Sequence, residues 1–282
     1  QYALNGGEWS ERKDILSIDN EIRAALGYPR RQDKFTQPWR LPDETPEHEV
    51  EMQLEFVSEI DISGAMLALE RPENAVVTLN GQQCSSEPQG FYVDRSIQKI
   101  ALSDIHRGVN RLSIKIPFCR KTNLEWMYIL GEFGVRVAGD EAVIVKAADT
   151  LRFGSIVTQG FPFYTGNVHY ELEASLPEDQ ACVYLEVPHF TAPVLEVAVD
   201  GKPAGIIAYA PHKLCLGALK GGVHTIEVTA FGNRFNGFGT IHNANDEFRW
   251  YGPDAYRTTG TQWSDHYLLK PFGVLSAVNL LY

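Results

Sequence analysis

Hydrophobic and polar residues alternate along most of the chain with a period of two. β-branched residues are frequent in these stretches, and clusters of Gly, Pro, Asn and Asp separate them, which is the pattern of short strands joined by turns. The clearest examples are HEVEMQLEFVSEI, NAVVTLNG, NRLSIKIPF, VHYELEAS, ACVYLEV, VLEVAVDG and HTIEVTAFG. The pattern predicts an all-β fold built as sandwiches or jelly rolls.

One segment near the N-terminus has a helical pattern instead. In SIDNEIRAALGYP, the apolar residues Ile22, Ala25 and Leu26 share one helical face. Asp19 or Asn20 is the predicted N-cap, and the GYP sequence at residues 27–29 is a stop signal. We therefore expect one short N-terminal helix, followed by a polar connection.

Several segments of the first half of the chain return in the same order in the second half. Such recurrence is typical of a duplicated module. Residues 50–55 match 168–173, 77–81 match 197–201, 108–116 match 222–230, and 128–135 match 267–274. The predicted organisation is an N-terminal helix and linker at 1–35, a first β-sandwich domain at 36–147 and a second at 148–282.

The second copy contains a long polar and aromatic loop at residues 233–266 that the first copy lacks. Aromatic rings stack on sugars while polar side chains bond their hydroxyls, so this composition favours a carbohydrate site. The alternative is that the rings pack the loop onto its own sandwich or against another domain. The candidate carbohydrate-binding residues are Arg234, Asn236, His242, Asn243, Asp246, Trp250, Tyr256 and Trp263, together with Tyr164 from GFPFYTG.

The overall charge narrows the choice of partner. The chain has a formal net charge of −11, which repels nucleic acid and anionic membranes at long range. No apolar run is long enough to span a bilayer. We expect a soluble chain that begins inside a longer protein, binds a neutral or weakly charged ligand such as carbohydrate, and has neither nucleic acid nor membrane as a partner. The sequence does not indicate the cellular compartment of the protein.

Motifs for catalysis, cofactors and metals are absent from the sequence. It contains no GxSxG, HExxH, GxGxxG or P-loop pattern, and no carboxylate pair for glycoside hydrolysis can be identified from it. We expect no cofactor; Asp246 and Glu247 in ANDEF are a weak candidate for structural Ca²⁺. The four cysteines lack metal or redox spacing, and Cys182 and Cys215 are expected to be buried free thiols.

Several short motifs carry a family resemblance. VTLNGQQ, VDGKPAG, GVNRLSI and GGVHTIEV resemble the galactose-binding-like jelly-roll domain of family 2 glycoside hydrolases. NEIRAALGYPRRQDKFTQPWRL, GFPFYTGNVHYELE and YLLKPFGV resemble the non-catalytic modules of α-L-rhamnosidase-like glycoside hydrolases. The resemblance implies two tandem galactose-binding-like jelly-roll domains with a short N-terminal helix. No segment resembles the catalytic barrel of those enzymes.

These observations leave three hypotheses. The chain is an accessory, non-catalytic fragment of a larger glycoside hydrolase-like protein that binds carbohydrate, supports the catalytic domain of the same parent chain, or does both. Alternatively, it is a structural scaffold that binds no sugar. Glycosidase activity in the fragment itself is the weakest of the three, because no catalytic motif supports it.

Overall fold

The computed structural model describes residues 1–282 except 31–40, 240 and 245–259. Within it the chain forms two compact units. Unit 1 comprises Gln1–Ala147 and His242–Leu268, and unit 2 comprises Ala148–Ile241 and Leu269–Tyr282. From the sequence, all of 148–282 was expected to form a second domain. The structure instead groups His242–Leu268 with the first part of the chain.

Unit 1 contains two sheets around one core. The strands of the larger sheet, in order, are β10 (Gly134–Ala138), β11 (Glu141–Val145), β2 (His48–Ser58), β8 (Gly108–Phe118), β4 (Val76–Leu79) and β5 (Gln82–Gln83), with β1 (Tyr2–Leu4) beside β2. The pair β11–β2 is parallel, and the other pairs, including β1–β2, are antiparallel.

The second sheet of unit 1 supplies the other side of the core. Its strands, in order, are β6 (Phe91–Tyr92), β7 (Asp94–Ala101), β3 (Met66–Glu70) and β9 (Tyr128–Leu130), and a 3₁₀ turn lies at Pro72–Asn74. Alternate residues of β2 and β8, such as Met52 and Ile114, are buried and pair across the sheet. They join Leu67 and Ile100 of the second sheet in one hydrophobic cluster. Alternation along the strands therefore decides which side faces the core.

Helix α1 (Ile15–Ala25) begins earlier than the sequence predicted. Its N-cap is Asp14, whose carboxylate accepts a hydrogen bond from the backbone N–H of Leu16 at 2.8 Å. The predicted N-cap Asp19 is instead a fully buried residue in the middle of the helix. The predicted stop is confirmed: Gly27 has a φ of +68°, and the N–H groups of Gly27 and Tyr28 close the last turn on Ala24 and Arg23.

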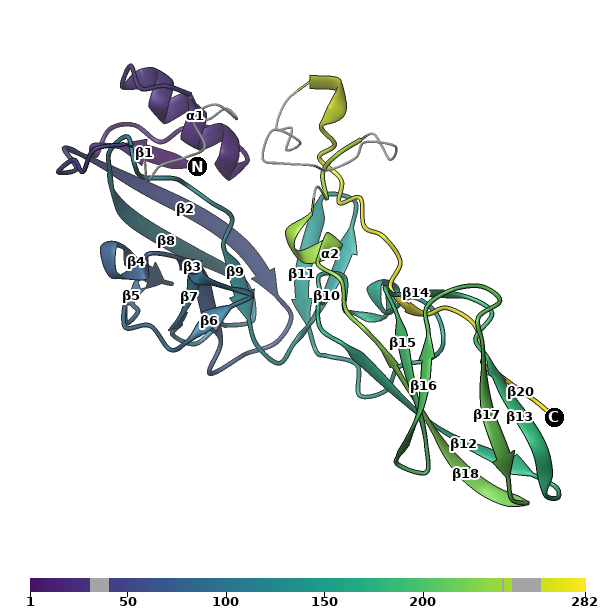
Figure 1. The fold of residues 1–282 in the computed structure, drawn as a ribbon. Coiled ribbons are helices and arrows are strands. Elements are labelled where there is room, and N and C mark those ends of the chain that lie inside the picture. The colour runs from purple at the N-terminus through teal and green to yellow at the C-terminus, as the bar shows by residue number, and fades with distance from the viewer. Residues whose placement is uncertain (31–40, 240, 245–259) are drawn as a thin grey trace. The chain divides into compact units, whose positions relative to one another are not determined.

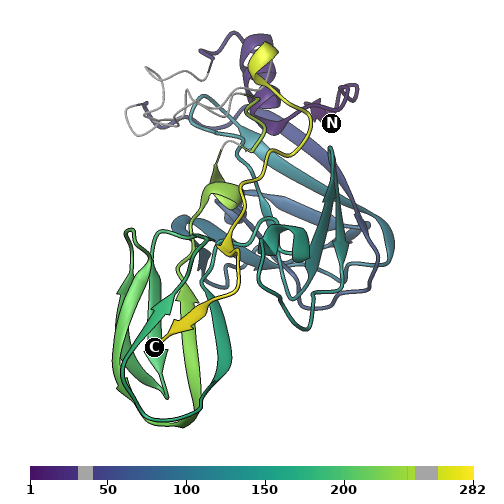
Figure 2. The same ribbon diagram turned by 90° about the vertical axis from the view of Figure 1, so that its right-hand side faces the viewer.

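The buried pair Asp19–Arg23 attaches α1 to the sandwich. The Arg23 Nε donates to Asp19 Oδ2 at 2.8 Å, and its Nη1 donates to the carbonyl of Arg120 at 3.2 Å. The other Asp19 oxygen accepts from the backbone N–H of Leu124 at 3.2 Å. Ile18 and Ile22 add apolar contacts to the core cluster. Figures 1 and 2 show α1 beside β1 in unit 1.

Unit 2 is a second two-layer sandwich. Figure 1 shows its sheets as facing layers, and their inner faces form one hydrophobic cluster that includes Leu185 and Val197. One sheet contains β12 (Val168–Leu176), β18 (Gly222–Ala230), β15 (Leu195–Val199) and β16 (Lys202–Ile207), and the other contains β17 (Lys213–Leu219), β13 (Gln180–Glu186) and β20 (Asn279–Leu281). Smaller elements are a 3₁₀ turn at Ile156–Gln159, the pair β14 (Phe190–Thr191) with β19 (Gly273–Val274), and α2 (Phe235–Phe238).

The main sheets of the two units have the same strand order. The order β2-β8-β4-β5 in unit 1 corresponds to β12-β18-β15-β16 in unit 2. The turns after β4 and β15 also match: Asn80 and Asp200 have φ values of +53° and +51°, and each side chain accepts a backbone hydrogen bond at 2.9 Å from the neighbouring strand. Three of the four segments matched in the sequence therefore lie at equivalent positions.

The fourth matched segment is not equivalent by strand pairing. In unit 1, β9 follows β8 and pairs with β3; the strand in that position of unit 2 is β20, which pairs with β13. Residues 267–274, which the sequence analysis matched to 128–135, lie before β20. The connection that differs is thus 119–127 between β8 and β9 and 231–278 between β18 and β20; the latter includes the His242–Leu268 segment of unit 1.

Two further sequence expectations have clear outcomes. The all-β fold with a short N-terminal helix is confirmed; α-helix in the described residues is limited to α1 and α2. The expected burial of Cys182 and Cys215 is wrong, because both thiols are exposed, whereas Cys84 and Cys119 are buried. The strands β13 and β17 alternate, so apolar neighbours in the sequence did not imply that the cysteines themselves face the core.

Removing the Arg23 side chain should destabilise unit 1 strongly. Arg23→Ala leaves the fully buried Asp19 carboxylate without its cation, which costs about 3–5 kcal/mol in the free energy of unfolding. Urea unfolding measures the loss. The matched control is Lys115→Ala, which breaks partly exposed ion pairs with Glu51 at 3.2 Å and Glu49 at 4.0 Å and should cost about 1 kcal/mol or less. Equal losses in the two variants would contradict the anchoring role of Arg23.

Candidate functional site

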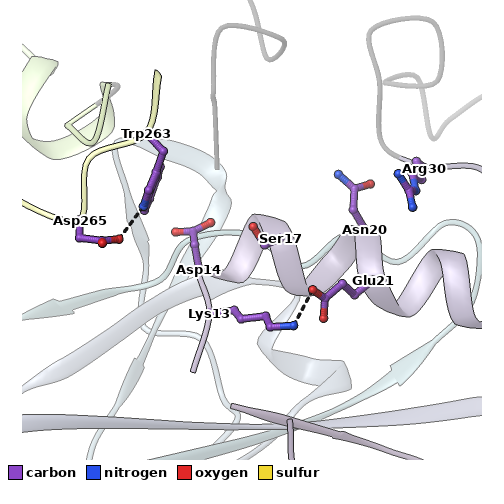
Figure 3. A pocket seen from close by; sticks show the side chains of 8 residues that line it. All are labelled: Lys13, Asp14, Ser17, Asn20, Glu21, Arg30, Trp263 and Asp265. Atoms are coloured by element: carbon purple, nitrogen blue, oxygen red, sulfur yellow. Dashed lines mark hydrogen bonds and ion pairs between the residues drawn. The ribbon is translucent and has the colours of Figure 1, made fainter. Parts of the chain in front are cut away.

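A polar pocket of about 610 Å³ opens in unit 1 where α1 faces the segment around Trp263. Figure 3 shows the side chains that line it. Most come from the start of α1 and the residue before its N-cap, and two come from the end of the His242–Leu268 segment. The lining residues are Lys13, Asp14, Ser17, Asn20, Glu21, Arg30, Trp263 and Asp265.

The residues of α1 reach the pocket because of helical spacing. Asp14, Ser17 and Glu21 are three and four residues apart, so they lie on one side of the helix. The apolar Ile18 and Ile22 lie on another side and are buried in the core cluster. The helix therefore packs its apolar side against the sandwich and presents a polar side to the pocket.

Asp14 lines the pocket, and both oxygens of its carboxylate accept hydrogen bonds. One oxygen caps the helix at Leu16, and the other accepts a hydrogen bond from the Trp126 Nε1 at 3.3 Å. Burial raises the pKa of the Asp14 carboxyl above its usual value, against the lowering effect of these two hydrogen bonds and of the nearby His242. The site thus contains a carboxylate whose negative charge is poorly solvated.

Trp263 is positioned by a short antiparallel contact within the His242–Leu268 segment. Asn243 and Trp263 form a β-bridge, and the backbone N–H of Ser264 donates to the carbonyl of His242 at 2.8 Å. The His242 ring stacks on the Trp263 ring with centroids 4.6 Å apart and an angle of 25°. The Trp263 Nε1 donates to Asp265 Oδ1 at 2.8 Å. These contacts hold the indole and the Asp265 carboxylate side by side.

The remaining charges lie farther along the helix. Lys13 and Glu21 form an ion pair at 2.7 Å, while Arg30 lies at the opposite end of the pocket from Trp263 (Figure 3). Such a site offers hydrogen-bond donors and acceptors around one aromatic ring. Such an arrangement can bind a small ligand that has both hydrogen-bonding groups and an apolar face.

The structure brings together only part of the predicted site. Trp263 lines the pocket, and His242 and Asn243 support it from the same segment. The Asn243 amide is buried, and neither of its polar atoms has a hydrogen-bond partner among the described residues. Asp246, Trp250 and Tyr256, like Glu247, lie outside the described residues.

The other three predicted residues belong to unit 2. Asn236 is buried, and its amide exchanges two hydrogen bonds of 2.9 Å with the backbone of Lys270, which is a structural arrangement. Arg234 is exposed and precedes α2. Tyr164 is half-exposed, and its hydroxyl donates to the carbonyl of Asn167 at 3.1 Å. None of them lines the pocket in unit 1.

Sequence reasoning missed most of the pocket. It identified the helix but treated it only as an element of the fold, and it included Trp263 but not Asp265 among the candidate residues. One signal in the sequence could have identified these residues. The polar residues at positions 14, 17 and 21 have helical spacing and lie on a different side of the helix from the apolar Ile18 and Ile22. No pattern in the sequence relates this helix to Trp263.

Metal-binding and membrane-spanning features are also not found in the described part of the chain. No group of three or more His, Cys, Asp or Glu side chains there is arranged to hold a metal ion. None of the helices in that part is sufficiently long and apolar to cross a membrane.

Comparison with known proteins gives only distant likenesses. No protein-family model matches the chain, and no curated protein sequence matches it. Among solved structures, it is similar to a rhamnosidase from Novosphingobium sp. PP1Y, with 14% identity and a TM-score of 0.33 over 84% of this chain and 23% of that one. The chain therefore spans about a quarter of the rhamnosidase's length.

Two other similar structures are also linked to carbohydrates. One is a lectin from Pleurotus ostreatus in complex with GalNAc, with 10% identity, coverage of 65% of this chain and 68% of that one, and a TM-score of 0.23. The other is a GH2 β-galacturonidase from Eisenbergiella tayi, with 11% identity, coverage of 66% and 29%, and a TM-score of 0.21. At these TM-scores the likenesses assign no function to the pocket.

The raised pKa of Asp14 predicts a specific pH dependence of stability. Because the folded state holds the Asp14 proton more tightly than the unfolded state, the contribution of Asp14 to stability is greatest in acid and falls as the pH rises through the folded-state pKa. Asp14→Ser keeps an N-capping side chain but removes the carboxyl. The free energy of unfolding of the wild type relative to this variant should decrease from acid to neutral pH.

Urea unfolding of both proteins at several pH values measures this difference. Carbon-13 NMR titration of the Asp14 carboxyl gives an independent reading and should show a midpoint above the usual Asp value. A difference in stability that stays constant or increases with pH would contradict the assignment.

Proposed function

We propose that the chain is an accessory, non-catalytic part of a larger glycoside hydrolase-like protein, and that unit 1 binds carbohydrate in the pocket between α1 and Trp263. The observation that carries the proposal is one aromatic ring beside a set of polar side chains in a pocket of about 610 Å³. This volume is within the range of about 300–1,000 Å³ of small-ligand sites.

The contacts expected for a sugar follow from the geometry. The C–H face of a pyranose packs on the Trp263 ring, because the opposite side of the indole is stacked on His242. Hydroxyl groups of the same sugar reach the side chains of Ser17 and Asn20 on the polar side of α1. Trp263 supplies the apolar contact and α1 the hydrogen bonds.

The accessory role is inferred from the sequence motifs. Those motifs resemble non-catalytic modules of family 2 and α-L-rhamnosidase-like glycoside hydrolases, and the chain shows no catalytic motif. The shared strand order of the two main sheets supports two copies of one galactose-binding-like jelly-roll module. In this proposal the partner besides the glycan is the catalytic domain of the parent chain, and neither a cofactor nor a nucleic acid or membrane partner is required.

A structural scaffold without sugar binding is the second candidate. One observation favours it: the Trp263 ring already stacks on His242 and bonds to Asp265, and Tyr267 also packs on His242 with centroids 4.8 Å apart. The aromatic residues of the His242–Leu268 segment would then serve only to attach that segment within unit 1.

Replacing Trp263 separates the two candidates. A glycan array with the whole chain identifies a ligand, and calorimetry then compares Trp263→Ala with the wild type. Affinity should fall at least about tenfold, because loss of a stacked ring removes on the order of 1 kcal/mol beyond its buried area.

The control is Trp9→Ala, which removes an indole that is 45% exposed in the same unit but does not line the pocket. Its affinity for the glycan should match that of the wild type. Absence of binding to every glycan on the array would reject carbohydrate recognition and leave the scaffold. Equal affinity in wild type and Trp263→Ala would place the sugar elsewhere.

A further inference from the structure

The charges of the pocket are separated along its length. Figure 3 shows Asp14 and Asp265 near the Trp263 ring at one end and Arg30 at the other. The cation nearest in sequence to Asp14 is Lys13, whose ammonium is paired with Glu21 at 2.7 Å. The end of the pocket that contains the indole is therefore acidic.

Asp265 is arranged so that its charge remains available to a ligand. Its Oδ1 accepts the indole N–H of Trp263 at 2.8 Å, which fixes the carboxylate beside the ring. Within the described residues no cation forms an ion pair with Asp265, and the residue is exposed. The Trp263 N–H is used in this bond, so a ligand meets the face of the ring and a carboxylate at its edge.

Asp14 adds a second negative charge from the helix side. The groups that act on it from neighbouring elements are Trp126, His242 and Tyr267, and Lys13 and Ser17 are its neighbours on α1. The hydrogen bonds that it accepts from Leu16 and Trp126 come from neutral N–H groups. Burial of this carboxylate is unfavourable, and a cation placed next to it would reduce the cost.

An indole face flanked by carboxylates is a site for a cation. A cation over the face of Trp is attracted by the ring quadrupole, and charged hydrogen bonds to carboxylates are about twice as strong as neutral ones. A neutral hydroxyl in the same place can donate to a carboxylate, but it gains neither the attraction to the ring face nor the attraction between opposite charges. The net charge of −11 of the whole chain also attracts a cationic ligand at long range.

We propose that the pocket recognises a glycan with a free amino group, whose ammonium lies over the Trp263 ring between the carboxylates of Asp14 and Asp265. This inference rests on the carbohydrate-binding function proposed above and specifies the sugar chemistry of that same pocket. The other sugars of the glycan extend along α1, past Ser17 and Asn20 toward Arg30.

Three tetrasaccharides with the same β-1,4 linkage test the proposal. The tetramers of glucosamine, N-acetylglucosamine and glucose differ only in the group at carbon 2 of each sugar: an ammonium, an amide or a hydroxyl. Calorimetry with the whole chain is carried out in a mildly acidic buffer, in which the amine is protonated. The glucosamine tetramer should bind at least about tenfold more tightly than the other two, as expected for a cation–π contact together with the attraction between opposite charges.

Asp265→Asn identifies the group that recognises the amine. This change keeps the size of an exposed side chain and an acceptor for the Trp263 N–H but removes the charge. It should lower the affinity for the glucosamine tetramer about tenfold and leave the affinity for the glucose tetramer unchanged. Asp104→Asn, at an exposed position of the same unit outside the pocket, should leave both affinities at the wild-type values.

The outcomes separate this inference from the proposed function. Equal affinities for the three tetramers, with loss of binding in Trp263→Ala, would overturn amine recognition but keep carbohydrate binding. A preference for glucosamine that survives Asp265→Asn would place the amine elsewhere and also overturn the inference. Failure of the three tetramers and of every array glycan to bind would reject both proposals.

Discussion

The buried ion pair between Asp19 and Arg23 is the constraint on which the rest of unit 1 depends. The two residues are 0% and 6% exposed. Their charges are tolerated in the protein interior because they form an ion pair with each other and hydrogen bonds with nearby backbone groups. Arg23 bonds to the carbonyls of Arg120 and Thr122, and its guanidinium lies 5.8 Å from the centre of the Phe118 ring. Helix α1 and the connection after β8 are thereby fixed to each other and to the core.

The pocket follows from this attachment. Once Ile18, Ile22 and the ion pair face inward, the three-to-four-residue spacing of the helix directs Asp14, Ser17 and Glu21 outward. The other wall is formed by a chain segment that is more than two hundred residues later in the sequence. Its β-bridge, its stacked rings and the bond from Trp263 to Asp265 make that wall a defined surface with an aromatic face and a carboxylate.

The strand orders show where the His242–Leu268 segment is inserted in the fold. Residues 119–127 connect β8 and β9, whereas residues 231–278 connect the equivalent strands β18 and β20 of unit 2 and include the His242–Leu268 segment that belongs to unit 1. A long connection on a β-sandwich changes little in the core, because loop length has a weak effect on stability. The additional residues can therefore carry recognition without disturbing the sheets.

The sequence by itself determined the local features of this protein. Alternation set the strands and their inner faces, Gly27 ended the helix, and Asn80 and Asp200 marked equivalent turns, because each depends on neighbouring residues or on a period of two. It also located Trp263 as a candidate for binding, from composition alone. These signals are local, and a short window of residues contains them.

Only the tertiary structure decided which unit contains His242–Leu268, that β20 rather than residues 267–274 corresponds to β9, and that Asp19 is a buried partner of Arg23 instead of an N-cap. It also decided that Trp263 lines one pocket with Asp14 of α1. The physical reason is the same in each case. Strand pairing, charge burial and pocket formation join residues distant in sequence, and their free energy depends on neighbours that no periodicity identifies.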